Sequence, residues 1–212
     1  MNPSDWQPYI SIGKDVVTAL AALTGGIVAI LGLKAWRKQL KGKTDYQLAR
    51  RLLRAVYEVR DDIRLIRSPF QSAAEIAQAL KETGVSGSFQ DPDFDFKTDQ
   101  AVYQIRWGKL HEALSNLRVE QLEAEVSWGN EVSTRLRPLR ECISKLKVAI
   151  RHHLRQLSRP QVGKHEPDAE AMEALDRIIY EYGGSAEDEV FTNEIRKAVE
   201  NIEEFLKPHL KL

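Results

Sequence analysis

The fold of this chain is decided by residues 16–33, whose sequence is VVTALAALTGGIVAILGL. The stretch contains no charged side chain, and only Thr18 and Thr24 interrupt its apolar character. An α-helix rises about 1.5 Å per residue, so this stretch would form a rod of roughly 27 Å, close to the hydrocarbon thickness of a bilayer. A helix without a polar stripe is typical of a membrane span. We therefore predict a transmembrane helix with a juxtamembrane extension over residues 16–40, after a short, poorly ordered outer tail at residues 1–15.

The two flanks of the apolar stretch differ in charge. Before it, Lys14 is outnumbered by acidic residues, whereas five basic residues follow it before the next acid. Because cytoplasmic flanks carry the excess of Lys and Arg, we expect the N-terminus outside and the rest of the chain in the cytoplasm. The predicted membrane-interface residues are Trp36, Arg37, Lys38, Lys41 and Lys43.

Two other interpretations of the stretch are weaker. A signal peptide has a basic N-terminal region, but residues 1–13 contain no Lys or Arg, and no small-residue cleavage site follows Leu33. A core helix of a soluble bundle usually keeps one polar stripe, which is missing here. The single cysteine, Cys142, forms no intrachain disulfide, as expected of a protein body in a reducing compartment.

Small residues recur four apart within the predicted span, a spacing that lets two helix backbones approach closely in lipid. They would allow self-association, although Ala and Gly are also common in membrane helices that stay single. The candidate helix–helix contact residues are Ala22, Gly25, Gly26 and Ala29.

Residues 44–212 are predicted to form an all-α, antiparallel bundle of about five to six helices, because no strand-like alternation of any length occurs. Thr44 and Gln47 resemble a capping box that would open the first helix after a hinge at Gly42. Pro69 would end this helix. Its apolar residues follow heptad spacing and are Ala49, Leu52, Val56, Val59, Ile63 and Ile66.

Local signals also mark the later helices. Ser72 opens a short helix that Gly84 ends, and a long helix is expected from near Thr98 to Gly129. Pro138 would lie in the first turn of the next helix, where proline is tolerated. A linker at residues 158–167, a fifth helix ending at Gly183 and a sixth opening at Ser185 complete the chain. The apolar stripe predicted for the long helix is Tyr103, Trp107, Leu110, Leu114, Leu117, Leu122 and Val126.

The net charge is zero, yet the two signs alternate along the chain. The net charge is +7 over residues 34–67, −6 over 68–133, +8 over 134–164 and −8 over 165–212. The simplest interpretation is that oppositely charged helices pack side by side, which helps to select neighbours while each surface pair adds little stability.

A basic face on the fourth helix is the best candidate for a binding surface. Besides pairing with the acidic helices of the chain, it could contact anionic lipid. Nucleic acid is a less favoured partner, because no aromatic side chains are interleaved with the cations. The candidate residues of the basic face are Arg137, Arg140, Lys147, Arg151 and Arg155.

No pattern in the sequence indicates catalysis, a cofactor or a metal. Asp91, Asp93 and Asp95 resemble the start of a calcium loop, but the glycine and the glutamate that such a loop needs are missing. Cys142 has no local histidine to activate it, and His153 lies on the apolar stripe of its helix. We therefore predict neither an enzyme nor a cofactor-binding protein.

Part of the chain resembles a group of uncharacterised bacterial single-pass membrane proteins with a helical cytoplasmic domain. The resemblance covers the anchor and the following helix, about a quarter of the chain. It implies a bacterial inner-membrane location and no particular activity. It is carried by WRKQLKGK at residues 36–43, LARRLL at 48–53, Tyr57, Arg60-Asp61 and RSPF at 67–70.

The function expected from these features is that of a membrane-anchored interaction or sensing module, with the lipid bilayer and an unidentified protein as partners. One alternative is a membrane-acting effector that forms homo-oligomers through its transmembrane helix. The other is a soluble helical protein that binds nucleic acid and buries the apolar stretch in its core.

Overall fold

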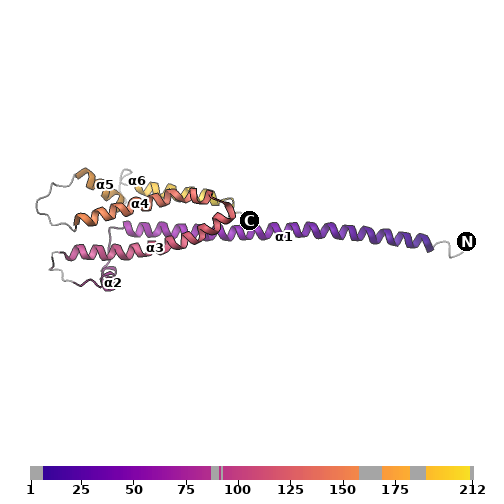
Figure 1. The fold of residues 1–212 in the computed structure, drawn as a ribbon, viewed down its shortest axis with the longest axis horizontal. Helices are drawn as coiled ribbons and strands as arrows, with labels where there is room; N and C mark the ends of the chain where they lie inside the picture. Colours follow the sequence, from indigo (N-terminus) through magenta and orange to yellow (C-terminus); the bar gives the residue numbers. More distant parts are fainter. Residues whose placement is uncertain (1–6, 87–90, 92, 158–168, 182–189, 211–212) are drawn as a thin grey trace. The chain divides into compact units, whose positions relative to one another are not determined.

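The computed structural model describes residues 7–86, 91, 93–157, 169–181 and 190–210, and these residues form six α-helices. In these residues no strand occurs, so the predicted all-α helical bundle is confirmed. The predicted linker at 158–167 and the predicted start of the last helix lie outside them. The helices are α1 (Gln7–Arg67), α2 (Ala73–Thr83), α3 (Phe94–Trp128), α4 (Glu131–Leu157), α5 (Ala169–Ile179) and α6 (Val190–Leu206) (Figure 1).

The chain divides into two compact units, one of residues 1–46 with Leu212 and one of residues 47–211. In the first unit, the side chains described between Leu20 and Thr44 are all exposed, including the large apolar ones. Val28, for example, is 68% exposed and Leu23 is 65% exposed. The alternative in which this stretch is a buried core helix is therefore wrong for these side chains. In the described part of the chain, no helix has both the length and the apolar character needed to cross a bilayer.

The start of the chain differs from the prediction in two ways. Helix α1 already begins at Gln7, inside the stretch expected to be an irregular tail. It also passes through Gly42 and Thr44 without a break. The Thr44 hydroxyl donates a hydrogen bond to the Leu40 carbonyl (3.1 Å), so Thr44 lies in a helix interior and is not an N-cap. The capping-box pattern fails here because the preceding residues are themselves helical, which leaves no free N–H groups to cap.

Helices α1, α3, α4 and α6 of the second unit pack antiparallel, and oppositely charged segments meet as predicted. Arg51 of α1 binds Glu120 (2.9 Å) and Glu123 of α3. Further along, Lys145 of α4 binds Glu194 of α6 (2.7 Å). The turn between α3 and α4 is made at Gly129, whose φ of +82° favours glycine. Figure 1 shows α3 and α4 as a hairpin, with α2 beside the start of α3.

The α1 stripe predicted from heptad spacing is confirmed. Its six residues, from Ala49 to Ile66, are each at most 1% exposed. They form one core with the inner faces of α3, α4 and α6. Burial of a Leu, Ile or Val side chain contributes about 1.5–3 kcal/mol, so this stripe is a main source of bundle stability.

The α3 stripe is correct only in its first half. After Leu117 the buried positions are Gln121 and Ala124, while Leu122 is 46% exposed and Val126 is 90% exposed. The stripe predicted past Leu117 selects Leu122 and Val126, which lie on the exposed face of α3. The polar atoms of the buried Gln121 are satisfied by hydrogen bonds with Glu125, Ser133 and Arg140 around the turn into α4.

Pro138 was expected in a first turn, but α4 begins at Glu131 and places it inside the helix. Proline removes the hydrogen bond that the carbonyl four residues earlier would accept. That residue is Thr134, which is exposed, so water can satisfy its carbonyl.

Two buried arginines connect parts of the chain that are far apart in sequence. Arg106 of α3 is 2% exposed and donates to the carbonyls of Ser68 (2.8 Å) and Phe70 (2.8 Å). It also forms two hydrogen bonds with Glu75, at 2.7 and 2.9 Å. Arg106 thereby fixes the irregular connection between α1 and α2.

Arg67, the last residue of α1, is 0% exposed and binds the C-terminal end of α5. Its guanidinium donates to the carbonyls of Arg177 (3.3 Å), Ile178 (2.9 Å) and Tyr180 (3.0 Å). Helix C-terminal carbonyls carry partial negative charge, so they are suitable partners for a buried cation. Burial lowers the pKa of Arg67, opposed by the Glu181 carboxylate at 3.6 Å.

Glu75 connects one of these networks to pH. The capping box predicted at the start of α2 is present, because the Ser72 hydroxyl accepts a hydrogen bond from the Glu75 N–H (3.1 Å). The hydrogen bonds from Arg106 hold the pKa of the Glu75 carboxyl below its usual value of 4.5. A carboxyl whose pKa is lower in the folded state stabilises the fold above its unfolded pKa. That stabilisation is lost as the pH falls through the folded pKa.

We therefore expect Glu75→Gln to lower the free energy of unfolding by about 2 kcal/mol at pH 7, the size of a charge-assisted hydrogen bond. The difference from the wild type should shrink below about pH 4.5, where the wild-type Glu75 begins to protonate. Denaturant unfolding of both proteins at pH 7, 5, 4 and 3 measures this difference in the free energy of unfolding. A difference that stays constant across this range would contradict the assignment.

Candidate ligand-binding groove

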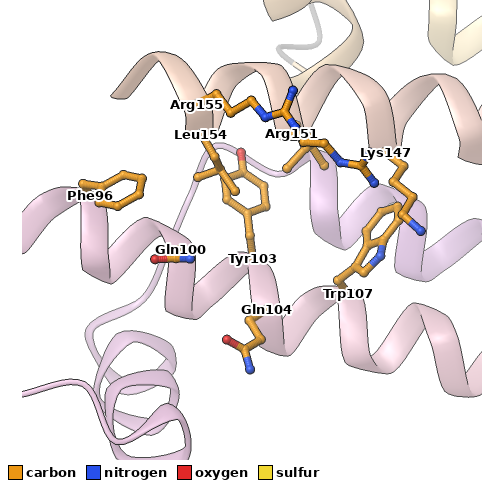
Figure 2. Close-up of a pocket in the computed structure, with 10 residues that line it drawn as sticks. Phe96, Gln100, Tyr103, Gln104, Trp107, Lys147, Arg151, Leu154 and Arg155 are labelled. Atoms are coloured by element: carbon orange, nitrogen blue, oxygen red, sulfur yellow. The ribbon is translucent and has the colours of Figure 1, made fainter. Parts of the chain in front are cut away.

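A groove of about 440 Å³ lies between the first half of α3 and the second half of α4. The antiparallel hairpin brings these two segments together, although they are about 50 residues apart in sequence. Figure 2 shows the aromatic side chains rising from α3 and the basic side chains extending along α4. The lining residues are Phe96, Gln100, Tyr103, Gln104, Trp107, Lys147, Ile150, Arg151, Leu154 and Arg155.

The α3 wall of the groove is aromatic. Phe96, Tyr103 and Trp107 follow one another at intervals of seven and four residues, which places them on one face of the helix. Phe96 and Trp107 are half-buried and Tyr103 is buried. Burial, and then the neighbouring Tyr180, raise the pKa of the Tyr103 phenol well above its usual value, so this ring stays neutral. The wall therefore offers planar apolar faces, next to the exposed amide of Gln100.

The α4 wall is basic. Lys147, Arg151 and Arg155 occur every fourth residue and line the groove together with Ile150 and Leu154. A four-residue step along a helix is about 6 Å, so the three positions span about 12 Å. No acidic side chain is among the described residues that line the groove. The groove therefore has the electrostatic character of an anion-binding site, with the aromatic wall on its α3 side.

Three other basic residues of α4 are paired within the bundle. Arg135 binds Glu131 (2.9 Å) and Asn201 (2.7 Å), Arg140 binds Gln121, and Lys145 binds Glu194.

Lys147 and Arg151, in contrast, form no hydrogen bond or ion pair with any residue that the structure describes. Two neighbouring cations with no partner in the described part of the chain are a favourable place for an external anion.

The basic face predicted from sequence is thus divided by the structure. Lys147, Arg151 and Arg155 are brought together in the groove. Arg140 is used within the bundle, at Gln121, and Arg137 is exposed outside the groove. The aromatic wall is not apparent from the sequence of α4, because its side chains come from α3. The signal that could have found it is the spacing of Phe96, Tyr103 and Trp107.

The residues predicted to lie at a membrane are exposed where the structure describes them. Trp36 is 65% exposed, and the four basic residues predicted with it are exposed as well. At Gly25 and Gly26, a Cβ atom would meet no other group within 4 Å. Ala29 is exposed, and the side chain of Ala22 is outside the described part.

The side chains considered for catalysis have no activating environment among the described residues. Cys142 is buried, and burial raises the pKa of its thiol, which disfavours the thiolate form. His153 is half-buried, with Nε2 3.4 Å from the Tyr180 hydroxyl. Nowhere in the described ranges do three His, Cys, Asp or Glu residues come close enough to hold a metal.

Comparison of the chain with protein-family models, with curated proteins and with solved structures found no match.

Proposed function

We propose that this chain is a single-pass, membrane-anchored helical protein whose cytoplasmic bundle binds a partner through the groove between α3 and α4. Residues 16–33 of α1 would cross the bacterial inner membrane with the N-terminus outside. The role is binding or sensing, without catalysis.

The observation that supports the anchor is apolar exposure on every side of α1. Leu20, Val28 and Leu33 point in different directions around the helix, yet each is 53–68% exposed. A helix that pairs with one other helix needs only one apolar stripe, whereas lipid accepts an apolar surface all round. A soluble protein also rarely leaves so large an apolar surface in contact with water.

The flanking charge supports the orientation. Lys34, Arg37 and Lys38 directly follow the apolar residues, and the next acid is Asp45. On the cytoplasmic side, Lys147 and Arg151 would be available to an anionic partner.

Membrane association is tested by adding charge to the apolar stretch. We expect the wild-type chain to stay in the membrane pellet after alkaline extraction. Leu23→Lys/Ile27→Lys should move it largely to the supernatant, because each lysine costs about 2.5–3.5 kcal/mol near the centre of a span. Both positions are exposed, so the substitutions remove no packing within the chain.

The matched control is Gln39→Lys/Leu40→Lys, which adds the same charges to exposed positions of α1 outside the stretch. It should remain in the pellet. Recovery of the wild-type chain in the soluble fraction without detergent would refute the anchor. Equal retention of the two double variants would refute it as well.

A further inference from the structure

We propose that the groove between α3 and α4 binds single-stranded nucleic acid, with phosphates on Lys147, Arg151 and Arg155 and bases stacked on Phe96 and Trp107. This inference rests on the proposed function only in taking the groove as the interaction site. It holds whether or not residues 16–33 cross a membrane.

The first reason is that aromatic and basic side chains both occur along the length of the groove. The α3 segment from Phe96 to Trp107 lines it together with the α4 cations. Phe96 and Trp107 are separated by eleven residues, about 16 Å along the helix. A site that combines aromatic faces with a basic track is the usual solution for binding single strands.

The second reason is the size of the basic row. Its three positions span about 12 Å, longer than the phosphate chain of one nucleotide, and their 6 Å step is comparable to the spacing of phosphates along an extended strand. A short polymer would therefore use the row more completely than a mononucleotide. An acidic peptide would supply charge but no series of planar rings for the aromatic wall.

The test is fluorescence anisotropy of a labelled (dT)12 oligonucleotide with the purified full chain in neutral detergent. We expect saturable binding that Lys147→Gln/Arg151→Gln weakens by at least about tenfold. The dependence of log affinity on log salt should fall from a slope of about −2 to about −0.7, because two of three phosphate contacts are lost. The matched control is Arg118→Gln/Arg137→Gln, which removes two exposed cations outside the groove.

A second readout tests stacking. A base stacked on Trp107 should quench tryptophan fluorescence on binding, and Trp107→Phe should abolish most of that quenching while affinity falls only a few-fold. Trp107→Ala should weaken binding by about tenfold. Circular dichroism of each variant checks that the bundle remains folded, and the Lys147/Arg151 variant keeps the proposal testable if Trp107→Ala unfolds.

Four outcomes would overturn the proposal: no saturable binding, an equal loss in the control variant, equal competition by polyglutamate, or binding of phosphatidylglycerol vesicles that depends on the groove cations while oligonucleotide binding does not. Failure here leaves the anchor untouched, because membrane extraction measures a different part of the chain. If the wild-type chain were recovered in the soluble fraction and still bound the oligonucleotide, it would instead be a soluble single-strand-binding protein.

Discussion

Replacing Arg106 with alanine should lower the free energy of unfolding of the bundle by about 3–5 kcal/mol. The substitution leaves the carbonyls of Ser68 and Phe70 without their donor and the Glu75 carboxylate without its cation. In a domain of this size the melting temperature should fall by about 10 °C. Thermal unfolding of the full chain, followed by circular dichroism, measures the change.

Arg118→Ala is the matched control for Arg106, because it removes an exposed arginine from the same helix. Its effect should stay within about 0.5 kcal/mol. A second variant, Arg106→Lys, keeps the charge but cannot reproduce the four hydrogen bonds, so we expect an intermediate loss. If Arg106→Ala were as stable as Arg118→Ala, the network would not contribute to folding.

Replacing Arg67 with alanine should cost a similar 3–5 kcal/mol, and its effect should be local to the C-terminal helices. Arg67 is the donor for three carbonyls at the end of α5 and also binds the Thr192 hydroxyl (2.9 Å) near the start of α6. Its guanidinium carbon lies 5.0 Å from the centre of the Phe191 ring. We therefore expect hydrogen exchange to increase in α5 and the first turn of α6 before it increases elsewhere.

The control for this variant is Arg64→Ala, one turn earlier in α1 and exposed. It should leave exchange in α5 unchanged. If Arg67→Ala lost hydrogen-exchange protection equally in all helices, α5 would not open independently of the rest of the bundle. Unchanged protection in α5 would mean that the buried cation does not hold it.

Much of the helical architecture could be predicted because its signals are local. Pro69 ends α1, Gly84 at φ +70° ends α2, and the Ser72 cap opens it. Each of these depends on the conformational preferences of one residue or on a contact within one turn. The heptad stripe of α1 is equally local, because its period alone determines which face is apolar.

The errors occurred where a local pattern competed with a larger context. Thr44 has the sequence of a cap, but continuous helix on both sides leaves it nothing to cap. Leu122 and Val126 have the spacing of core residues, but the face of α3 that carries them lacks an apolar partner at those positions. Side-chain period indicates which residues share a face but does not show what packs against that face.

The buried arginines and the groove could not be predicted, for a different reason. Arg67 and Arg106 resemble ordinary surface cations in sequence, and only the folded chain shows that carbonyls from distant segments surround them. The groove likewise depends on two helices meeting, with Trp107 from one and Arg151 from the other. The basic row was visible in the sequence, whereas the lack of a partner for Lys147 and Arg151 among the described residues was not.

The hydrogen bond from Arg67 to the Tyr180 carbonyl spans 113 residues, so it can form only after a delay during synthesis. At about 5–20 residues per second, the ribosome needs roughly 6–23 seconds to make the acceptors after the arginine has been added. Until then the nascent α1 carries a cation at the edge of an unfinished core. The C-terminal helices are thus needed to complete the domain, and a fragment that ended before Arg177 would be expected to require chaperones or be degraded.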